Sequence, residues 1–347
     1  MIDLTHYGLN DPISHPDHLI PARITAVHKE RFAIVCIHGE GHARIKTSEF
    51  LHPSACYPTV GDFVLVGYNP SGDSLIYKTL PRRTYFSRRD PSPGRGEQAV
   101  AANFDYVFIM QSCNMDINAR RLERYLTLAW QSGAQPVVLL TKADLVPDPV
   151  PYLAALESAA TGVPVHVVSA HTGDGLSALT PYLQPGSTIV FLGSSGVGKS
   201  SLVNALMQKD VMAVRGIRED DSKGRHTTTH RQLLMLPCGA MLIDTPGMRE
   251  LGMWDVSEGL GDAFADVEAF AIRCRFRNCT HQSEPGCAVR AAITEGLLAP
   301  ERWQSYCNLR REAKYADDKQ AFLREKQQWH KSIRKEQKRI KKGGWDE

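Results

Sequence analysis

Residues 193–200 read Gly-Ser-Ser-Gly-Val-Gly-Lys-Ser, the G-x-x-x-x-G-K-[ST] pattern of a phosphate-binding loop. Glycines in such a loop let backbone N–H groups surround phosphate oxygens, and the helix that follows adds a favourable dipole. Lys199 is placed to reach the β- and γ-phosphates, Ser200 to ligate Mg²⁺ and Ser201 to reach the α-phosphate. The predicted phosphate-binding residues are Gly193, Ser194, Ser195, Gly196, Val197, Gly198, Lys199, Ser200 and Ser201.

A second motif, Thr-Lys-Ala-Asp at residues 141–144, can select the base of a bound nucleotide. The Asp144 carboxylate can accept hydrogen bonds from both N1–H and the 2-amino group of guanine, a paired contact that adenine does not offer. The Lys142 stem would pack on the base, and Ser169-Ala170 would present a backbone N–H to guanine O6. Threonine stands first where such motifs usually have asparagine, but the motif and the phosphate loop together indicate GTP. The predicted base-binding residues are Thr141, Lys142, Ala143, Asp144, Ser169 and Ala170.

Two further segments could supply magnesium, γ-phosphate and catalytic contacts. The aspartate of Asp-Thr-Pro-Gly at 244–247 would hold Mg²⁺ through water, and the Gly247 N–H would sense the γ-phosphate. In the preceding polar run Gly-Arg-His-Thr-Thr-Thr, we expect Thr228 to reach Mg²⁺ and the γ-phosphate. Met248 stands where a water-orienting glutamine often lies, so His226 is a candidate for positioning or deprotonating water; the alternative is a solvent-exposed loop histidine. The predicted catalytic residues are His226, Thr228 and Lys199, and the predicted Mg²⁺ and γ-phosphate contacts include Asp244 and Gly247.

Three cysteines and one histidine form the compact pattern Cys-x4-Cys-x-His-x5-Cys. Three thiolates and one imidazole suit a closed tetrahedral zinc site, which contributes folding energy rather than catalysis. An open catalytic zinc is disfavoured because protein ligands fill all four positions; the remaining alternative is unrelated free thiols near a histidine. The predicted ligands of one structural Zn²⁺ are Cys274, Cys279, His281 and Cys287. The arginines around them, which could face phosphate, are Arg273, Arg275, Arg277 and Arg290.

The motifs occur in a circularly permuted order. An ordinary small GTPase has the phosphate loop first, then the switch threonine, D-x-x-G, [NT]-K-x-D and Ser-Ala. Here the segments 141–144 and 169–170 precede 193–200 and 244–247. The same sheet can be built with its chain ends moved, because natural termini tend to lie close together. The permutation places D-x-x-G at the C-terminal boundary of the domain, where a nucleotide-dependent movement would pass to whatever follows.

The elements that must position these residues begin with short strands between residues 22 and 80. Turn signals rich in glycine, proline and asparagine separate them. The predicted strands are Arg23–Val27, Arg31–Ile37, His42–Lys46 and Asp62–Tyr68. Several short strands over this length predict a small β-barrel of the OB type, the alternative being a β-domain with only a packing role.

From residue 105 to residue 244, strands alternate with helices. Near-continuous apolar strands interleaved with helices predict a mostly parallel sheet covered on both faces, which is the α/β P-loop fold. The predicted strands are Tyr106–Met110, Pro136–Leu140, Pro164–Val168, Thr188–Leu192, Gln232–Leu236 and Met241–Ile243. The predicted helices are Ala119–Gln131, Val150–Ala160 and Ser200–Lys209. Beyond Gly252 the chain reads as helical around the cysteine cluster and ends in the charged helix Glu301–Ile340.

With 347 residues, the chain is long enough for several domains that each bury a core. The patterns place an OB-fold β-barrel at 1–85, a linker at 86–98, a circularly permuted GTPase domain at 99–251 and an α-helical zinc-binding domain with a basic tail at 252–347. The net charge is only +3, but residues 331–342 hold seven Lys/Arg against one acid. That run is either a solvated face or a contact for structured RNA.

The remaining patterns concern location. No apolar run approaches the roughly 18 residues that span a membrane. The N-terminal sequence lacks the basic and apolar regions of a signal peptide, and eight cysteines in so long a chain do not resemble a disulfide framework. We therefore expect a cytoplasmic monomer without membrane association.

The quoted motifs, their permuted order and the zinc spacing resemble the RsgA family, the small-ribosomal-subunit-dependent, circularly permuted GTPases of bacteria. The resemblance covers nearly the whole length and includes the segments 80–88 and 132–138. It implies an N-terminal OB-fold, a C-terminal zinc domain, GTP hydrolysis stimulated by the small subunit, contact with ribosomal RNA and a role in late maturation of the 30S subunit. It also implies that His226 matches the histidine proposed to assist hydrolysis.

Two functions are consistent with these observations. The first is a GTP-hydrolysing assembly factor with GTP, GDP, the small ribosomal subunit and its rRNA as partners, and with Mg²⁺ and one Zn²⁺ as cofactors. The alternative is a nucleotide-gated RNA-binding module whose hydrolysis is incidental. A zinc metalloenzyme is a weaker third reading. GTP turnover with and without small subunits separates the first two, and metal chelation tests the third.

Overall fold

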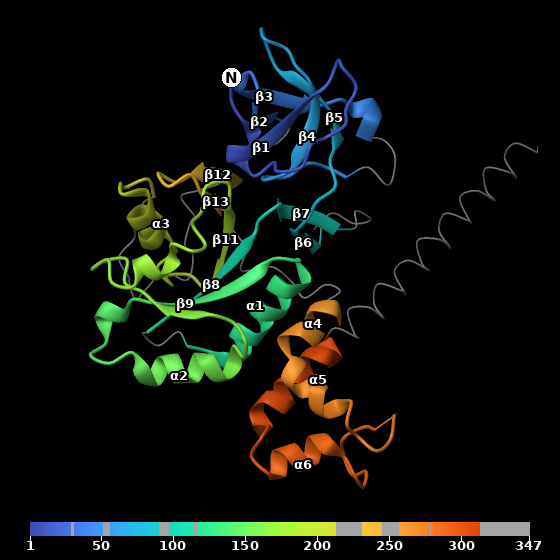
Figure 1. Cartoon of the computed structure of the whole chain (residues 1–347), viewed down its shortest axis with the longest axis vertical. Helices are drawn as coiled ribbons and strands as arrows, with labels where there is room; N and C mark the ends of the chain where they lie inside the picture. Colours follow the sequence, from blue (N-terminus) through green and yellow to red (C-terminus); the bar gives the residue numbers. More distant parts are fainter. Residues whose placement is uncertain are drawn as a thin grey trace, which may run out of the picture. The chain divides into compact units, whose positions relative to one another are not determined.

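The computed structural model describes residues 1–28, 31–50, 56–89, 97–113, 117–212, 231–244, 257–277 and 279–312 (Figure 1). The chain forms two compact units. The first unit comprises Met1–Arg88 and Ala99–Leu251, and the second comprises Arg89–Gln98 and Gly252–Glu347. Within the described ranges, no helix has both the length and the apolar character that crossing a membrane requires.

A five-stranded barrel forms the N-terminal part of the first unit, so the predicted small β-barrel is confirmed, with one strand more than the four predicted. Its strands run in the order β1-β2-β3-β5-β4, and pairing between β1 and β4 closes the barrel in the manner of an OB-fold. Alternate side chains point inward, so that Ala22, Ile24 and Ile34 lie in one apolar core. The strands are β1 (Ile20–His28), β2 (Arg31–Cys36), β3 (Gly39–Ile45), β4 (Phe63–Gly67) and β5 (Ser74–Thr79).

The second part of the first unit is a six-stranded α/β sheet in the order β10-β9-β8-β11-β13-β12. Neighbours pair in parallel except β12, which is antiparallel to β13, so the predicted mostly parallel sheet is confirmed. The strands are β8 (Tyr106–Ser112), β9 (Gln135–Thr141), β10 (Val165–Val167), β11 (Thr188–Gly193), β12 (Arg231–Met235) and β13 (Met241–Asp244). The connecting helices are α1 (Ala119–Gln131), α2 (Val150–Ala159) and α3 (Lys199–Met207).

Both faces of this sheet are covered. On one face, Phe108 of β8 lies in a core with Leu202 and Val203 of α3. The intervening residue Val107 is equally buried, at 0% exposure, and α1 packs on β8 and β9. The alternation along β8 therefore serves two cores at once, which is why the strand reads as a continuous apolar run.

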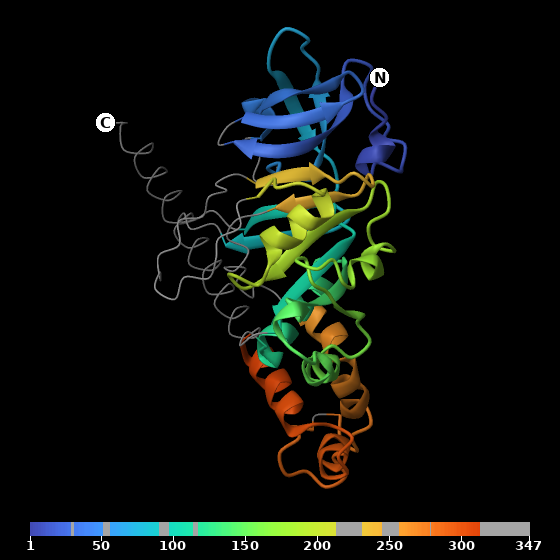
Figure 2. The ribbon, with the colours of Figure 1, turned by 90° about the vertical axis from the view of Figure 1, so that its left-hand side faces the viewer.

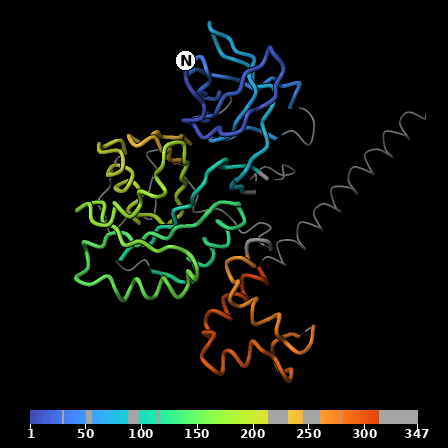
Figure 3. The backbone as a smooth tube through the Cα atoms, in the orientation of Figure 1, coloured from blue at the N-terminus to red at the C-terminus, as the bar shows by residue number. Residues whose placement is uncertain are grey.

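The barrel and the α/β sheet are one continuous eleven-stranded sheet, because β1 changes partner along its length. Residues 20–23 pair with β4, whereas Ala26 and Val27 pair with Gln232 and Arg231 of β12. A bulge in the β1–β2 ladder between Ile24 and Ala26 marks the change. Figures 2 and 3 show the gold segment of β12 and β13 beside the blue barrel strands, although the two lie some two hundred residues apart in sequence.

Two short strands, β6 (Tyr85–Arg89) and β7 (Glu97–Ala102), pair with each other at the position where the sequence predicts a linker. In the second unit, the described helices are α4 (Ser257–Ala263), α5 (Ala265–Ala271), α6 (Ala288–Thr294) and a helix at residues 300–312. These helices share an apolar core that includes Phe264, Val267 and Cys287. The predicted helix Glu301–Ile340 is described as far as residue 312.

Candidate nucleotide-binding site and metal centre

The predicted phosphate and base motifs lie at one edge of the α/β sheet, where parallel strands end. β11 leads into the phosphate loop and α3, β9 ends at Thr141, and β13 ends at Asp244. The strand order reverses between β8 and β11, because the chain runs outward from β8 to β10 and then returns to β11. In open α/β sheets, ligands bind in the crevice at the carboxyl ends of the strands beside such a switch point.

Two glycines shape the phosphate loop. At Gly193 a Cβ would lie 3.0 Å from the Met110 carbonyl oxygen, so a side chain would be crowded there. Gly198 has a φ of +101°, in the left-handed region that favours glycine, and α3 begins at the next residue. Val197 between them is buried in the core, while Ser195 is exposed. Val197 thus anchors the loop to the core, and Ser195 in the middle of the loop faces solvent.

Thr141, the first residue of the base motif, holds the phosphate loop. Its hydroxyl lies 2.6 Å from the Val197 carbonyl oxygen and 3.1 Å from the Gln111 carbonyl oxygen, and the residue is 4% exposed. The hydroxyl carries one proton, so it can donate fully to only one of these two acceptors. Base motif and phosphate loop are therefore joined by one buried hydrogen bond, made here by threonine in the place of the usual asparagine.

Asp144 and Ser169, which both belong to the predicted base-binding residues, lie in direct contact. The Ser169 hydroxyl donates to Asp144 Oδ1 at 2.5 Å and accepts from the backbone N–H groups of His171 and Thr172, both at 3.2 Å. Ser169 is completely buried, whereas Asp144 is exposed. The serine therefore fixes one carboxylate oxygen and leaves the rest of the Asp144 carboxylate open to solvent. Lys142, the second residue of the base motif, has a left-handed φ of +59°.

Lys199 and Asp244 form an ion pair at the same edge, with Nζ 2.9 Å from Oδ1. The Asp244 side chain is 3% exposed and the Lys199 side chain 34% exposed. Ser200, the next residue of α3, is half-buried. A hydroxyl and a buried carboxylate are oxygen ligands of the kind that Mg²⁺ takes. The predicted residues His226, Thr228 and Gly247 lie outside the described residues.

Sequence reasoning missed Gln111, which supports Thr141. The Gln111 side chain is completely buried; its amide donates to the Asn118 carbonyl at 3.3 Å and accepts from the Asn118 N–H at 2.9 Å. Asn118 in turn caps α1 by accepting from the Arg121 N–H. The available signal was a glutamine that follows the apolar run Tyr106–Met110, since a buried amide at a strand end needs partners.

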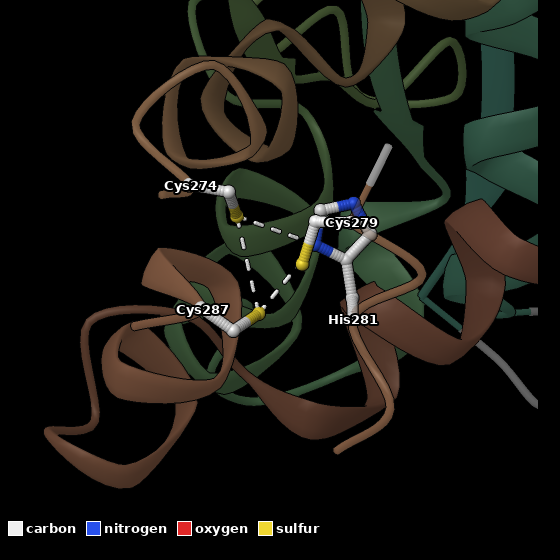
Figure 4. A group of neighbouring side chains, drawn as sticks. All are labelled: Cys274, Cys279, His281 and Cys287. Atoms are coloured by element: carbon white, nitrogen blue, oxygen red, sulfur yellow. Dashed lines mark hydrogen bonds between the residues drawn. The ribbon is translucent and has the colours of Figure 1, made fainter. Parts of the chain in front are cut away.

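The four predicted zinc ligands form one cluster in the second unit. Figure 4 shows the three sulfurs and the His281 ring pointing toward one another. Their ligand atoms all lie within 4.8 Å of one another. Cys274 Sγ lies 3.9 Å from Cys287 Sγ, and His281 Nδ1 lies 3.4 Å from the first sulfur and 3.5 Å from the second.

These distances suit a single tetrahedral ion. Two sulfurs bound to zinc at about 2.3 Å would lie about 3.8 Å apart, and a sulfur and a nitrogen about 3.6 Å apart. Burial raises the pKa of the Cys274 thiol, but the backbone N–H groups of Val289 and Ala288 and the neighbouring thiols outweigh it and lower that pKa. Burial lowers the pKa of His281. These two shifts favour the thiolate and neutral imidazole forms that bind metal, whereas burial raises the pKa of Cys279 to about 11, so that a metal would have to displace its proton.

Glu284 shapes the loop that carries His281, a role that sequence reasoning missed. Its carboxylate accepts from the Thr280 N–H at 2.7 Å, the Thr280 hydroxyl at 2.5 Å, and the N–H groups of Gln282 and Ser283 at 3.0 and 3.1 Å. Hydrogen bonds from Thr280 lower the pKa of Glu284 to about 2. An acid four residues after a threonine, inside a turn, was the available signal.

A phosphate loop at the switch point of an α/β sheet, with a Thr-Lys-x-Asp motif fixed beside it, defines a P-loop nucleotide-binding protein. Because the base motif lies on strands that precede the phosphate loop in sequence, the class is that of the circularly permuted GTPases. The model of the RsgA GTPase family matches residues 79–254.

A "Small ribosomal subunit biogenesis GTPase RsgA 2" from Lactiplantibacillus plantarum is 42% identical over 95% of this chain and 99% of its own. The crystal structure of YjeQ from Thermotoga maritima superposes with a TM-score of 0.64 at 25% identity, covering 84% of this chain and 97% of that one. That of YloQ, described as a circularly permuted GTPase, has the same fold with a TM-score of 0.62 at 23% identity, over 87% and 98% of the two chains. The chain belongs to the RsgA GTPase family.

Proposed function

We propose that this chain hydrolyses GTP as an assembly factor in the late maturation of the small (30S) ribosomal subunit, whose binding stimulates the reaction. The observation that carries the nucleotide part is the buried bond between the Thr141 hydroxyl and the Val197 carbonyl, which joins base motif to phosphate loop. The subunit part is supported by family membership and by the printed name of the Lactiplantibacillus plantarum relative.

Guanine selection rests on the open side of Asp144. With one oxygen held by Ser169, the carboxylate can accept from guanine N1–H and the 2-amino group. The Ala170 N–H would meet O6, and the Lys142 stem would cover the base. Adenine would leave the exposed carboxylate facing a ring nitrogen without a proton, so the site rejects it.

The triphosphate would lie on the phosphate loop, from Gly193 to Ser201. Lys199 now pairs with Asp244, and β- and γ-phosphate oxygens would compete for its ammonium. Ser200 and Asp244 are the residues that would hold Mg²⁺. When bound, Mg²⁺ neutralises charge on the β- and γ-phosphates.

Hydrolysis would be completed by residues outside the described ranges. Water attacks the γ-phosphorus as the bond to the β–γ bridging oxygen breaks, giving GDP and inorganic phosphate. We assign His226 to positioning that water, Thr228 to the γ-phosphate and Gly247 to sensing it. Met248 has no hydrogen-bonding group suited to water. Its presence would make intrinsic GTP hydrolysis slow until the small subunit binds.

The second unit would contribute a structural Zn²⁺ held by Cys274, Cys279, His281 and Cys287. Four protein ligands leave no open position, so this ion would stabilise the fold rather than act on substrate. The exposed arginines around it support contact with ribosomal RNA, and they are Arg273, Arg275, Arg277 and Arg290. We further propose that the chain acts in the cytoplasm as a monomer. Its proposed domain boundaries are 1–85, 86–98, 99–251 and 252–347.

GTP turnover, measured with and without purified small ribosomal subunits, tests the proposal. We expect the subunit to raise turnover by at least about tenfold, because a trans-acting partner can complete a phosphoryl-transfer site. Asp144→Asn should lose this reaction with GTP and regain it with xanthosine triphosphate, whose C2 carbonyl can accept from the new amide. Turnover that ignores the subunit would favour the nucleotide-gated RNA-binding module instead.

A further inference from the structure

An aromatic contact joins the metal cluster to the helix at residues 300–312. The Trp303 ring meets the ring of His281 edge to face, with centroids 5.2 Å apart and planes at 78°. Trp303 also stacks on Tyr306, one turn further along its helix, at 5.6 Å and 28°. Edge-to-face and offset stacked pairs are the arrangements that aromatic rings prefer. His281 is thus the ligand that a neighbouring helix holds in place.

The same helix is fastened to α5, which leads into Cys274. Arg302 donates to both oxygens of Asp266, at 2.6 and 2.7 Å, and to the Ala263 carbonyl at 3.0 Å. The Tyr306 hydroxyl donates to Glu268. The helix therefore bridges two of the segments that carry metal ligands: it contacts α5, which precedes Cys274, and the loop residue His281.

His281 needs this support because its backbone is unfavourable. Its φ of +60° lies in the left-handed region, which costs free energy for a residue with a side chain. The orientation that brings Nδ1 to within 3.5 Å of two sulfurs is also the one in which Trp303 packs on the ring. A rotation of the imidazole ring would therefore break both its approach to the two sulfurs and its contact with Trp303.

We propose that Trp303 is a positioning residue of the metal centre, and that metal binding and docking of the helix at residues 300–312 are a single coupled event. The inference rests on the metal-binding part of the proposed function.

Zn²⁺ affinity of the full-length chain, measured by competition with a chromophoric chelator, tests the positioning role. Trp303→Ala should weaken binding by about tenfold or more, the effect typical of groups that orient a ligand, and Trp303→Phe by less than about threefold because a ring remains. Leu309→Ala is the matched control, since Leu309 is buried in the same core on the same helix. Equal losses in Trp303→Ala and Leu309→Ala, or no loss in Trp303→Ala, would overturn the role.

Hydrogen exchange tests the coupling without relying on a variant that folds. Removing the metal from the wild-type chain should raise the exchange rates of backbone amides at 304–312 by at least about tenfold, and restoring Zn²⁺ should reverse this. Unchanged protection after verified metal loss would overturn the coupling while leaving the metal centre intact. A wild-type chain that binds no Zn²⁺ would overturn both; GTP turnover reports separately on the nucleotide site.

Discussion

At the scale of single residues, the nucleotide site depends on one shared proton. The Thr141 hydroxyl faces two carbonyl oxygens, those of Val197 and Gln111, and the shorter contact goes to the phosphate loop. The proposed base motif and the proposed phosphate loop are therefore linked through one buried residue. A change at this position should affect binding of GTP and GDP alike, because both contain guanine and phosphates.

Thr141→Val tests that link. Valine has nearly the same shape but no donor, so the buried Val197 carbonyl would lose its partner at a cost of about 1–3 kcal/mol. We expect the Kd values of GTP and GDP to rise about tenfold, measured by titration with fluorescent nucleotide analogues. Thr141→Ser keeps the hydroxyl and should bind within about threefold of wild type. Unaltered affinity in the valine variant would show that the phosphate loop keeps its conformation without the hydrogen bond from Thr141.

Motifs predicted the residues of this site but not the contacts that hold them. Asp144 and Ser169 follow from fixed spacing patterns, and their mutual hydrogen bond follows once both strands end at one sheet edge. Gln111 acts mainly through its backbone carbonyl, which depends on the register of β8 against β9. Trp303 lies in the predicted charged helix Glu301–Ile340, where no motif connects it with the metal ligands. A glutamine after an apolar run does not reveal which hydroxyl its backbone carbonyl meets, and the role of Trp303 leaves no local pattern.

At the scale of elements, Arg23 fastens β1 to the α/β sheet. Since β1 alternates, its neighbours Ala22 and Ile24 enter the barrel core while Arg23 points the other way and is completely buried. Its guanidinium donates to the backbone carbonyls of Tyr7, Gly61 and Asn103. It also donates to the Thr188 hydroxyl and the Met241 sulfur, at the starts of β11 and β13. Burial lowers the pKa of Arg23 to about 10, so it stays charged at neutral pH.

Removing this guanidinium should loosen barrel and sheet together. Arg23→Met fills much of the space but orphans several buried acceptors, and we expect the free energy of unfolding to fall by about 3 kcal/mol. Arg23→Lys, which keeps the charge and three donors, should lose less. Urea unfolding followed at the barrel and at the nucleotide site would measure this. A loss confined to the barrel signal would contradict a joint anchor.

Elements were predicted best where a single local pattern governs them. Ala119–Gln131 has the boundaries of α1, because Asn118 caps its start and its apolar face repeats regularly. β5 was missed: its sequence Ser-Leu-Ile-Tyr-Lys-Thr mixes buried and exposed side chains without clean alternation. The pairing of β1 with β12 joins residues some two hundred positions apart, and nothing local in either strand specifies that partner.

At the scale of the whole molecule, the candidate nucleotide site and the cysteine–histidine cluster belong to different compact units. The barrel belongs to the same unit as the nucleotide site and is continuous with it through β12. A ligand that binds only the folded form stabilises the unit that holds its site. The two ligands should therefore act on separate unfolding transitions.

Calorimetry of the full chain tests this division. GDP at about one hundred times its Kd should raise the Tm of one transition by roughly 5 to 10 °C, and a zinc chelator should lower the Tm of the other. The nucleotide-induced shift should persist in the presence of chelator. One transition moved by both ligands would refute independent units.

The change of partner along β1 also has a consequence for solubility. A sheet edge presents unpaired N–H and C=O groups that can template association with other chains. At one end of the α/β sheet the edge is β10, only three residues long. At the other end, β12 is covered by Ala26 and Val27 of β1. By pairing with β12, the barrel strand β1 protects this edge of the α/β sheet from association with other chains. A truncated chain that lacks the barrel would expose β12 as an aggregation-prone edge.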